Sequence, residues 1–165
     1  MSKTSKKSES VAFLLAQVGA HAASQFAQRL GPLGLTPPHA GMLRAIERNV
    51  GINQKALSNL LGLLPSRMVV LLDELQEHGL LERRVSPDDR RTHALYLTRQ
   101  GSKALEGIGR VAREHDEALC AGLSNEERRT LGDLLGRLAE RQGLTPGVHP
   151  GFARLGRPSK QRGPA

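Results

Sequence analysis

The chain has 165 residues, which suits a single domain large enough to bury a core without metal or disulfides. Aromatic residues make up only 2% of it, so we expect a core of Leu, Val, Ile and Ala. The single cysteine, Cys120, excludes an intrachain disulfide and any zinc site with two thiolate ligands. Neither a run of roughly 18 apolar residues nor an export signal is present, so we expect a soluble, cytoplasmic protein.

Most of the net charge of +8 lies at the two ends of the chain. No acid occurs in residues 1–8 or 142–165, and these segments carry the basic residues Lys3, Lys6, Lys7, Arg154, Arg157, Lys160 and Arg162. Basic blocks of this kind indicate a polyanionic partner, nucleic acid before an anionic membrane, or serve only as solubilising tails. We expect residues 1–9 and 142–165 to be disordered, because the first segment lacks apolar periodicity and Gly and Pro interrupt the second.

Between these ends, the first part of the chain has the apolar spacing of amphipathic helices. Ser10–Leu30 places its apolar side chains on one face and is followed by Gly and Pro, which end a helix. Thr36 can cap a second helix that begins with proline, and Asn53 can cap a third, short one. Pro65 opens a fourth helix, which ends at Gly79. The sequence thus predicts one long helix followed by three shorter ones.

The period of the apolar residues changes after the fourth helix. Leu80–Val85 and His93–Leu97 are short extended runs on either side of a polar, turn-rich segment, so they predict a β-hairpin. Thr98 can cap a fifth helix. Ser124 and Glu127 form the capping box of a sixth.

Two short helices joined by a Gly-containing turn and followed by a hairpin predict a winged helix-turn-helix unit over residues 35–97. In such a unit the second helix enters the DNA major groove and the hairpin loop reaches the minor groove. The alternative is a compact small fold that has no role in DNA binding. The predicted fold class is mainly α with a small β-hairpin wing, flanked by helical regions at residues 10–31 and 98–141.

One stretch makes this pattern specific: GLLERRVSPDDRRTHALYLTRQG, residues 79–101. It contains a Gly-Leu exit from the fourth helix, an Asp-x-Arg in the hairpin loop and a Leu-Thr-x-x-Gly entry to the next helix. The residues concerned are Gly79, Leu80, Asp89, Arg91, Leu97, Thr98 and Gly101. With these motifs the chain resembles the multiple-antibiotic-resistance regulator (MarR) family over residues 10–141, and neither basic tail belongs to the resemblance.

The resemblance implies a homodimeric transcriptional regulator, a repressor, whose partner is double-stranded DNA. Members of the family pair through their first and last two helices, so residues 10–31 and 98–141 are the expected dimerisation helices. The apolar faces of these helices independently require partners beyond a single subunit. A two-fold dimer implies a pseudo-palindromic operator with half-sites about one helical turn apart.

The fourth helix is the expected recognition helix. Its spacing turns six side chains outward: Ser66, Arg67, Val69, Val70, Asp73 and Glu74. Arg67 lies near the helix start, where its guanidinium can bind a guanine edge, and Ser66 can contact a phosphate or a base. Val69 and Val70 stand where the family usually has polar residues. They either pack against thymine methyl groups or are covered by a neighbouring element.

The hairpin adds four arginines to the expected DNA contacts, namely Arg83, Arg84, Arg90 and Arg91. The resemblance implies that one wing arginine enters the minor groove, and Arg90 is our candidate because narrow A·T-rich grooves attract guanidinium groups. We expect Asp89 and Arg91 to brace the wing as an ion pair. Asn53 and Lys55, at the start of the third helix, can serve the phosphates.

The resemblance also implies a small aromatic acid or phenol as a releasing effector, bound between the dimerisation helices and the winged unit. The candidate contacts are His21, His39, Met42 and His115. A metal held by these histidines with Glu114 is an alternative, although their spacing matches no compact metal motif, and histidines without any such role are the other. We predict no cofactor.

Two further functions compete with the regulator. The first is an architectural protein that binds DNA with little sequence preference through its basic tails. Residues 154–162 (RLGRPSKQR) are similar to an AT-hook, but Leu155 replaces the arginine usual before the glycine, so non-specific phosphate contacts are the alternative for this tail. The second is an enzyme, which the sequence disfavours because it has neither a phosphate-binding glycine loop nor a nucleophile paired with a base.

Overall fold

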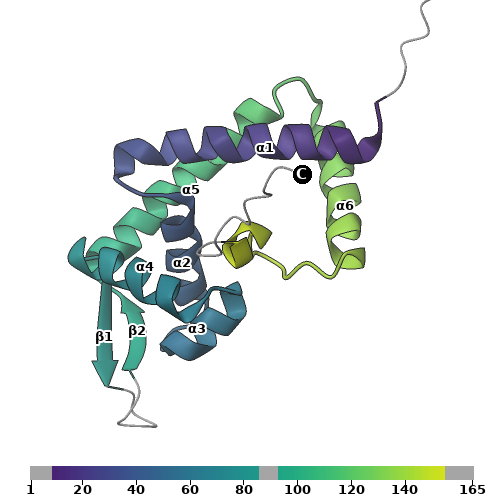
Figure 1. The fold of residues 1–165 in the computed structure, drawn as a ribbon. Coiled ribbons are helices and arrows are strands. Elements are labelled where there is room, and N and C mark those ends of the chain that lie inside the picture. The colour runs from purple at the N-terminus through teal and green to yellow at the C-terminus, as the bar shows by residue number, and fades with distance from the viewer. Residues whose placement is uncertain (1–8, 86–92, 155–165) are drawn as a thin grey trace, which may run out of the picture.

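The structure, a computed structural model, describes residues 9–85 and 93–154 (Figure 1). Its elements are α1 (Val11–Leu30), the 3-10 turn η1 (Gly31–Leu33), α2 (Pro37–Arg48), α3 (Gln54–Leu61), α4 (Pro65–Glu77), β1 (Leu81–Val85), β2 (His93–Leu97), α5 (Arg99–Leu119), α6 (Asn125–Arg141) and the 3-10 turn η2 (Pro150–Arg154). The predicted fold class is confirmed. Within the described ranges no single helix is long and apolar enough to cross a membrane, and the pair α3 and α4, bent by 113°, passes that test by length and composition only.

The helices α2, α3, α5 and α6 begin directly after the residues that were predicted to cap them. The side chain of Asn53 accepts a hydrogen bond from the N–H of Ala56 at 2.8 Å. Ser124 and Glu127 exchange the two hydrogen bonds of a capping box at the start of α6. The hydrogen bond with the backbone N–H of Ser124 lowers the pKa of the Glu127 carboxyl, and the hydrogen bond with the Ser124 hydroxyl lowers it further. These bonds satisfy backbone donors that the first helical turn leaves free, so the sequence marks helix starts well.

The core lies inside the winged unit, where α2, α3, α4 and the hairpin meet. Its fully buried side chains include Met42, Leu43, Ile46, Leu57, Met68, Leu71, Leu72, Leu75 and Leu95. Burial of each such side chain contributes about 1.5–3 kcal/mol, so apolar packing is the main force that holds the unit together. Because α4 turns its apolar stripe toward this core, its opposite face remains on the surface.

The hairpin is attached to the helix-turn-helix at the start of α3. β1 and β2 pair antiparallel, with Leu81 opposite Leu97. The N–H of Leu95 on β2 donates to the carbonyl oxygen of Ile52, just before α3, at 2.9 Å. The position of the wing is therefore fixed relative to α3 as well as to α4.

A close contact joins the end of α4 to the beginning of α5, and we call it the α4–α5 junction (Gly79, Leu80, Thr98 and Gly101). The hydroxyl of Thr98 donates to the carbonyl of Gly79 at 2.6 Å, and its N–H donates to the carbonyl of Leu80 at 3.1 Å. Gly101 comes so close that a Cβ there would lie 2.0 Å from the carbonyl oxygen of Leu80. The junction therefore requires glycine at position 101.

The two long helices α1 and α5 pack along each other, while α6 lies apart from the winged unit (Figure 1). No residue of α6 is buried, and all residues in the first half of α1, 11–20, are exposed. Both segments carry apolar side chains that face solvent in this single chain: Val11, Phe13, Leu14, Leu15, Val18, Leu131, Leu134, Leu135 and Leu138. The frame of α1, α5 and α6 thus has an uncovered apolar surface.

Residues 142–152 differ from the prediction, which placed them in a disordered tail. They lead from the end of α6 back toward α2 and reach η2, where Phe152 is only 5% exposed (Figure 1). The ring of Phe152 joins the core because Gly41 leaves room for it on α2. Gly and Pro exclude an α-helix here, as expected, but they permit a packed loop. We call residues 142–152 the C-terminal strap.

Replacement of Gly101 by alanine should disrupt the α4–α5 junction, because the new methyl group would meet a backbone carbonyl that cannot rotate away. We expect Gly101→Ala to lower the free energy of unfolding by about 3 kcal/mol, measured by chemical denaturation at a fixed protein concentration. Gly109→Ala on the same helix is the matched control, because its nearest neighbour is the flexible end of Arg113 at 3.5 Å. Equal stability of the two variants would contradict the requirement for glycine.

Candidate nucleic-acid interface

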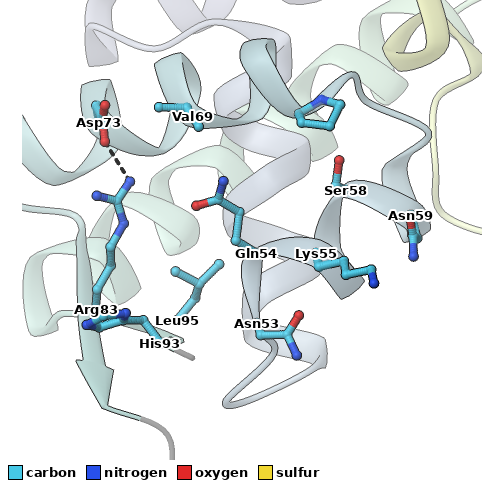
Figure 2. Close-up of a pocket in the computed structure, with 11 residues that line it drawn as sticks. Asn53, Gln54, Lys55, Ser58, Asn59, Val69, Asp73, Arg83, His93 and Leu95 are labelled. Carbon is cyan, nitrogen blue, oxygen red and sulfur yellow. Dashed lines mark hydrogen bonds and ion pairs between the residues drawn. The ribbon is translucent and has the colours of Figure 1, made fainter. Parts of the chain in front are cut away.

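α3, α4 and the hairpin enclose a hollow of about 900 Å³ on one face of the winged unit (Figure 2). Its lining consists of Asn53, Gln54, Lys55, Ser58, Asn59, Pro65, Val69, Asp73, Arg83, His93 and Leu95. We call this surface the interface hollow. Four of its residues, Asn53, Lys55, Val69 and Arg83, were predicted from the sequence to contact DNA, and the structure brings them together.

The outer face of α4 borders this hollow. Ser66 is exposed and Arg67 is half-buried near the first turn of the helix. Val69 and Val70 are 42% and 43% exposed. Among the described residues no other element covers these two valines, so the structure leaves them accessible to a ligand. The first two turns of α4 contain no acidic side chain, and their outer face is open to solvent.

A salt bridge ties α4 to the wing across the hollow (Figure 2). Arg83 Nη2 on β1 lies 2.6 Å from Asp73 Oδ1 on α4. Arg83 was expected to contact DNA, but its guanidinium is engaged by Asp73, and its buried Nε finds no other partner in the part of the chain that the structure describes. The pair fixes the wing relative to α4 and offsets the negative charge of Asp73 on this face.

Arg84 lies on the opposite side of β1, because successive residues of a strand point to opposite faces. It forms an ion pair with Glu82, and its guanidinium carbon lies 4.6 Å from the centre of the Tyr96 ring. Arg84 does not line the interface hollow. Any DNA contact from Arg84 would therefore lie outside the interface hollow.

A second polar link connects α4 to α2. His39 is only 5% exposed, and both of its ring nitrogens have partners. Nδ1 accepts a hydrogen bond from the N–H of Thr36 at 3.4 Å, and Nε2 donates to Glu74 Oε2 at 2.8 Å. Glu74 was expected to face outward, and its side chain is 40% exposed. His39 was expected to bind an effector, but in this structure its two ring nitrogens are engaged by Thr36 and Glu74.

The other predicted effector contacts are in three different environments. Met42 is fully buried in the core, so it is not available to a ligand in this structure. His21 is exposed on α1 and lies 3.0 Å from Gln25. His115 on α5 packs against the Phe26 ring, with 5.6 Å between ring centres, and no protein group within the described ranges bonds to its buried Nδ1. In those same ranges no three metal-binding side chains come together.

The predicted wing-tip residues Asp89, Arg90 and Arg91 lie outside the described residues. The same is true of the Gly-Arg-Pro motif at residues 156–158. The minor-groove contact, the Asp89–Arg91 ion pair and the AT-hook similarity therefore stay predictions.

Sequence reasoning missed four polar side chains of the interface hollow, namely Gln54, Ser58, Asn59 and His93. Gln54 and Asn59 lie on α3, and His93 begins β2 opposite Val85. The sequence could have indicated Gln54 and Asn59, because they are polar residues at the start of α3 and about one and a half turns later. His93 carried no such signal, since only the hairpin register brings it to the hollow.

Comparison with known proteins gives matches along most of the chain. Residues 33–92 match the model of the MarR family. A transcriptional regulatory protein for the hcr operon of Thauera aromatica is 39% identical over 113 residues, which is 68% of this chain and 68% of that protein. The transcriptional repressor Rv2887 of Mycobacterium tuberculosis is 28% identical over 76% of this chain and 91% of its own.

Solved structures extend the similarity to the fold. The transcriptional repressor CouR, bound to a 23-mer DNA duplex, aligns with a TM-score of 0.71 at 31% identity and covers 84% of this chain and 99% of its own. The MarR-family protein Rv2887, in complex with DNA, aligns with a TM-score of 0.70 at 25% identity over 79% of this chain and 98% of its own. Both are similar to this chain across the winged unit and the helical frame together.

Replacement of His39 by alanine tests whether this histidine is structural. We expect His39→Ala to lower the free energy of unfolding by about 2 kcal/mol, because it removes the side-chain acceptor of the Thr36 N–H at the start of α2 and the link to Glu74. His21→Ala is the control, and as an exposed surface change it should stay within about 0.5 kcal/mol of the parent. Chemical denaturation of both variants measures the difference. A stable His39→Ala protein would argue against the link to Glu74.

Proposed function

The chain belongs to the MarR family of transcriptional regulators, and from that premise we propose that it is a sequence-specific, DNA-binding repressor of the cytoplasm. It acts as a homodimer on a pseudo-palindromic operator and is released by a small aromatic or phenolic molecule. The observation that carries the proposal is the interface hollow, where an acid-free, exposed start of α4 lies beside the polar start of α3 and the wing.

In the proposed complex α4 enters the major groove with its first two turns. Arg67 binds a guanine edge through its two-pronged guanidinium, and Ser66 contacts a phosphate or a base. Val69 and Val70 pack against thymine methyl groups, which suits their exposure. Apolar contacts of this kind would favour A·T pairs in the middle of each half-site.

The remaining contacts hold the protein on the duplex. Asn53 and Lys55 bind phosphates from the start of α3, where helix N–H groups and a positive charge meet. Arg90 enters the minor groove from the wing. Arg83 acts through its salt bridge with Asp73. By fixing the wing against α4, it sets the distance between the helix that enters the major groove and the wing that enters the minor groove.

The uncovered surface of α1 and α6 supports the homodimer. A groove between these helices is lined by Val11, Leu15, Leu131, Leu134, Leu135 and Leu138. Burial of an exposed leucine contributes about 1.5–3 kcal/mol, so closing this surface against a second copy stabilises the protein substantially. Two copies related by a two-fold axis would present two winged units to successive turns of one face of the duplex.

The effector part of the proposal rests on α1 and α5. His115 and Phe26 form an aromatic pair there, and the unpartnered Nδ1 of His115 is suited to a phenol hydroxyl or a carboxylate. His21 lies on α1, the helix that carries Phe26. His39 and Met42 are excluded from this site, because one is bonded to Glu74 and the other is fully buried.

The DNA beside the chain's own gene provides the test. At ~150 mM salt we expect at least ~10³-fold tighter binding to this DNA than to a scrambled duplex, measured by fluorescence anisotropy. Arg67→Ala should lose about 1–3 kcal/mol of discrimination at one position of each half-site. Lys55→Ala, a phosphate contact, should instead weaken binding to both duplexes alike.

Two outcomes would contradict this assignment. A binding ratio near one would favour an architectural protein that uses its tails. An unchanged base preference in Arg67→Ala would remove Arg67 from direct readout. Deletion of residues 155–165 keeps Phe152 in place and should reduce the salt dependence of binding while it preserves the preference for the specific duplex.

Replacement of Leu135 on α6 by lysine should dissociate the homodimer, because a charge would enter its apolar interface. Light scattering should then give the mass of one chain for Leu135→Lys and of two chains for the parent. Val50→Lys is the control, since Val50 is exposed in the loop after α2. A parent protein that is itself monomeric would contradict the proposal.

A further inference from the structure

Two separated places join the frame of α1, α5 and α6 to the winged unit. At one end of the frame, α1 leads through η1 into α2, and α5 starts at the α4–α5 junction (Figure 1). α6 lies at the other end and, within the described ranges, contributes no residue to the core cluster. The C-terminal strap, which follows α6, contributes Phe152 and the partly buried Val148 to that cluster. The strap therefore attaches the α6 end of the frame to the winged unit.

Hydrogen-bonded turns make the strap a stiff connection. Its start is fixed to α6 by a Schellman motif, in which the N–H groups of Gly143 and Leu144 donate to carbonyl groups of the last helical turns at 2.9 and 3.0 Å. Two more turns follow, closed by backbone hydrogen bonds that Val148 and Phe152 donate, each at 3.1 Å. Residues held in such turns have few free torsions, so the strap transmits the position of α6 better than a flexible linker would.

The strap contacts α2 at two points. A Cβ at Gly147 would lie 2.7 Å from Nη1 of Arg48, in the last turn of α2. A Cβ at Gly41, in the first half of α2, would lie 2.5 Å from Cζ of Phe152. At 1.5 Å per residue the two contacts are roughly 10 Å apart along the helix. They therefore fix the direction of the strap along α2 as well as its distance from it.

α2 passes this constraint on to the recognition helix. Its side chains Met42, Leu43 and Ile46 are fully buried in the core that α2 shares with α4. In addition, His39 Nε2 donates to Glu74 Oε2 on α4 at 2.8 Å. Because α2 and α4 are packed and bonded together, the strap sets the orientation of α6 relative to α4 as well as to α2.

A single attachment acts as a hinge, whereas two separated attachments fix an angle. Without the strap, the winged unit would be free to turn about the α4–α5 junction relative to α6. In the proposed homodimer, α6 belongs to the part of each protomer that pairs with its partner. The angle between α6 and the winged unit then determines how far apart the two winged units are.

We propose that the strap is a brace that sets the distance between the two winged units, and that Phe152 is a positioning residue for the spacing of the operator half-sites. This inference rests on the proposed function. Phe152 itself contacts no DNA and acts through α2. One base pair inserted between the half-sites moves one of them by about 3.4 Å and turns it by about 34°. The braced homodimer resists this change, and a homodimer without the brace adapts to it.

Operators with altered spacing test the brace on the full chain. The operator is located by footprinting in the DNA beside the chain's own gene, and one base pair is then inserted between its half-sites. At ~150 mM salt we expect the insertion to weaken binding of the parent at least ~100-fold and binding of Phe152→Ala at most ~10-fold, measured by fluorescence anisotropy. A base change inside one half-site should weaken both proteins equally, since α4 is unchanged.

Three further variants separate the brace from general stability. Gly41→Ala should behave as Phe152→Ala does, because its methyl group takes the space of the ring, while alanine favours a helix more than glycine does. Phe152→Leu keeps an apolar side chain on α2 and should retain the parent's preference for spacing. Leu144→Ala, at an exposed strap residue, is the matched control and should behave as the parent. Equal losses on the inserted operator for the parent, Phe152→Ala and Gly41→Ala would overturn the inference.

Spin labels give a second measurement that contains no DNA. A label on Val50→Cys, in a chain that also carries Cys120→Ser, lies in the exposed loop after α2, and the homodimer carries two such labels. Double electron–electron resonance should give a distribution of label distances that is at least ~2-fold broader after Phe152→Ala, because the winged units turn more freely. An unchanged width would overturn the brace. A narrow parent distribution that broadens in this way, together with no preference for the specific duplex, would count against the proposed function alone.

Discussion

The α4–α5 junction is the contact on which the rest of the structure depends. At this junction α4 ends, the hairpin begins and ends, and the long helix α5 starts. Two hydrogen bonds from Thr98, to the carbonyl groups of Gly79 and Leu80, hold these segments together. The missing side chain of Gly101 allows the backbones to approach this closely. Any rotation of α5 is therefore passed to α4 and to the hairpin together. In the homodimer that we propose, the frame would in this way set the spacing of the two winged units.

The positions of the charged residues on α4 follow from the packing of its apolar face. Its apolar face is used by the core, so two acids, Asp73 and Glu74, had to remain near the surface that we assign to DNA. Each is bonded to a neighbouring element, Asp73 to Arg83 of the wing and Glu74 to His39 of α2. The acids thereby brace α4 on two sides while their repulsion of phosphates is reduced. Arg67, at the other end of the helix, keeps its charge available.

Much of this architecture could be predicted from the sequence, because its signals are local. Caps such as Asn53 and Ser124, and stripes such as that of α4, depend only on residues within a turn or two. The link from His39 to Glu74 could not be predicted, since spacing along the chain does not say which buried polar groups will meet. The strap was missed for a related reason: its Gly and Pro content indicates disorder, and the partner of Phe152 is an absent side chain, that of Gly41.

The return of the strap to α2 also limits where the remaining positive charge can go. Ten residues separate Phe152 from Arg162, and a fully extended chain of that length spans at most roughly 36 Å. The chain beyond residue 154 therefore starts beside the winged unit instead of at the far end of α6. If Phe152 left α2, that starting point would move away from the winged unit together with the strap.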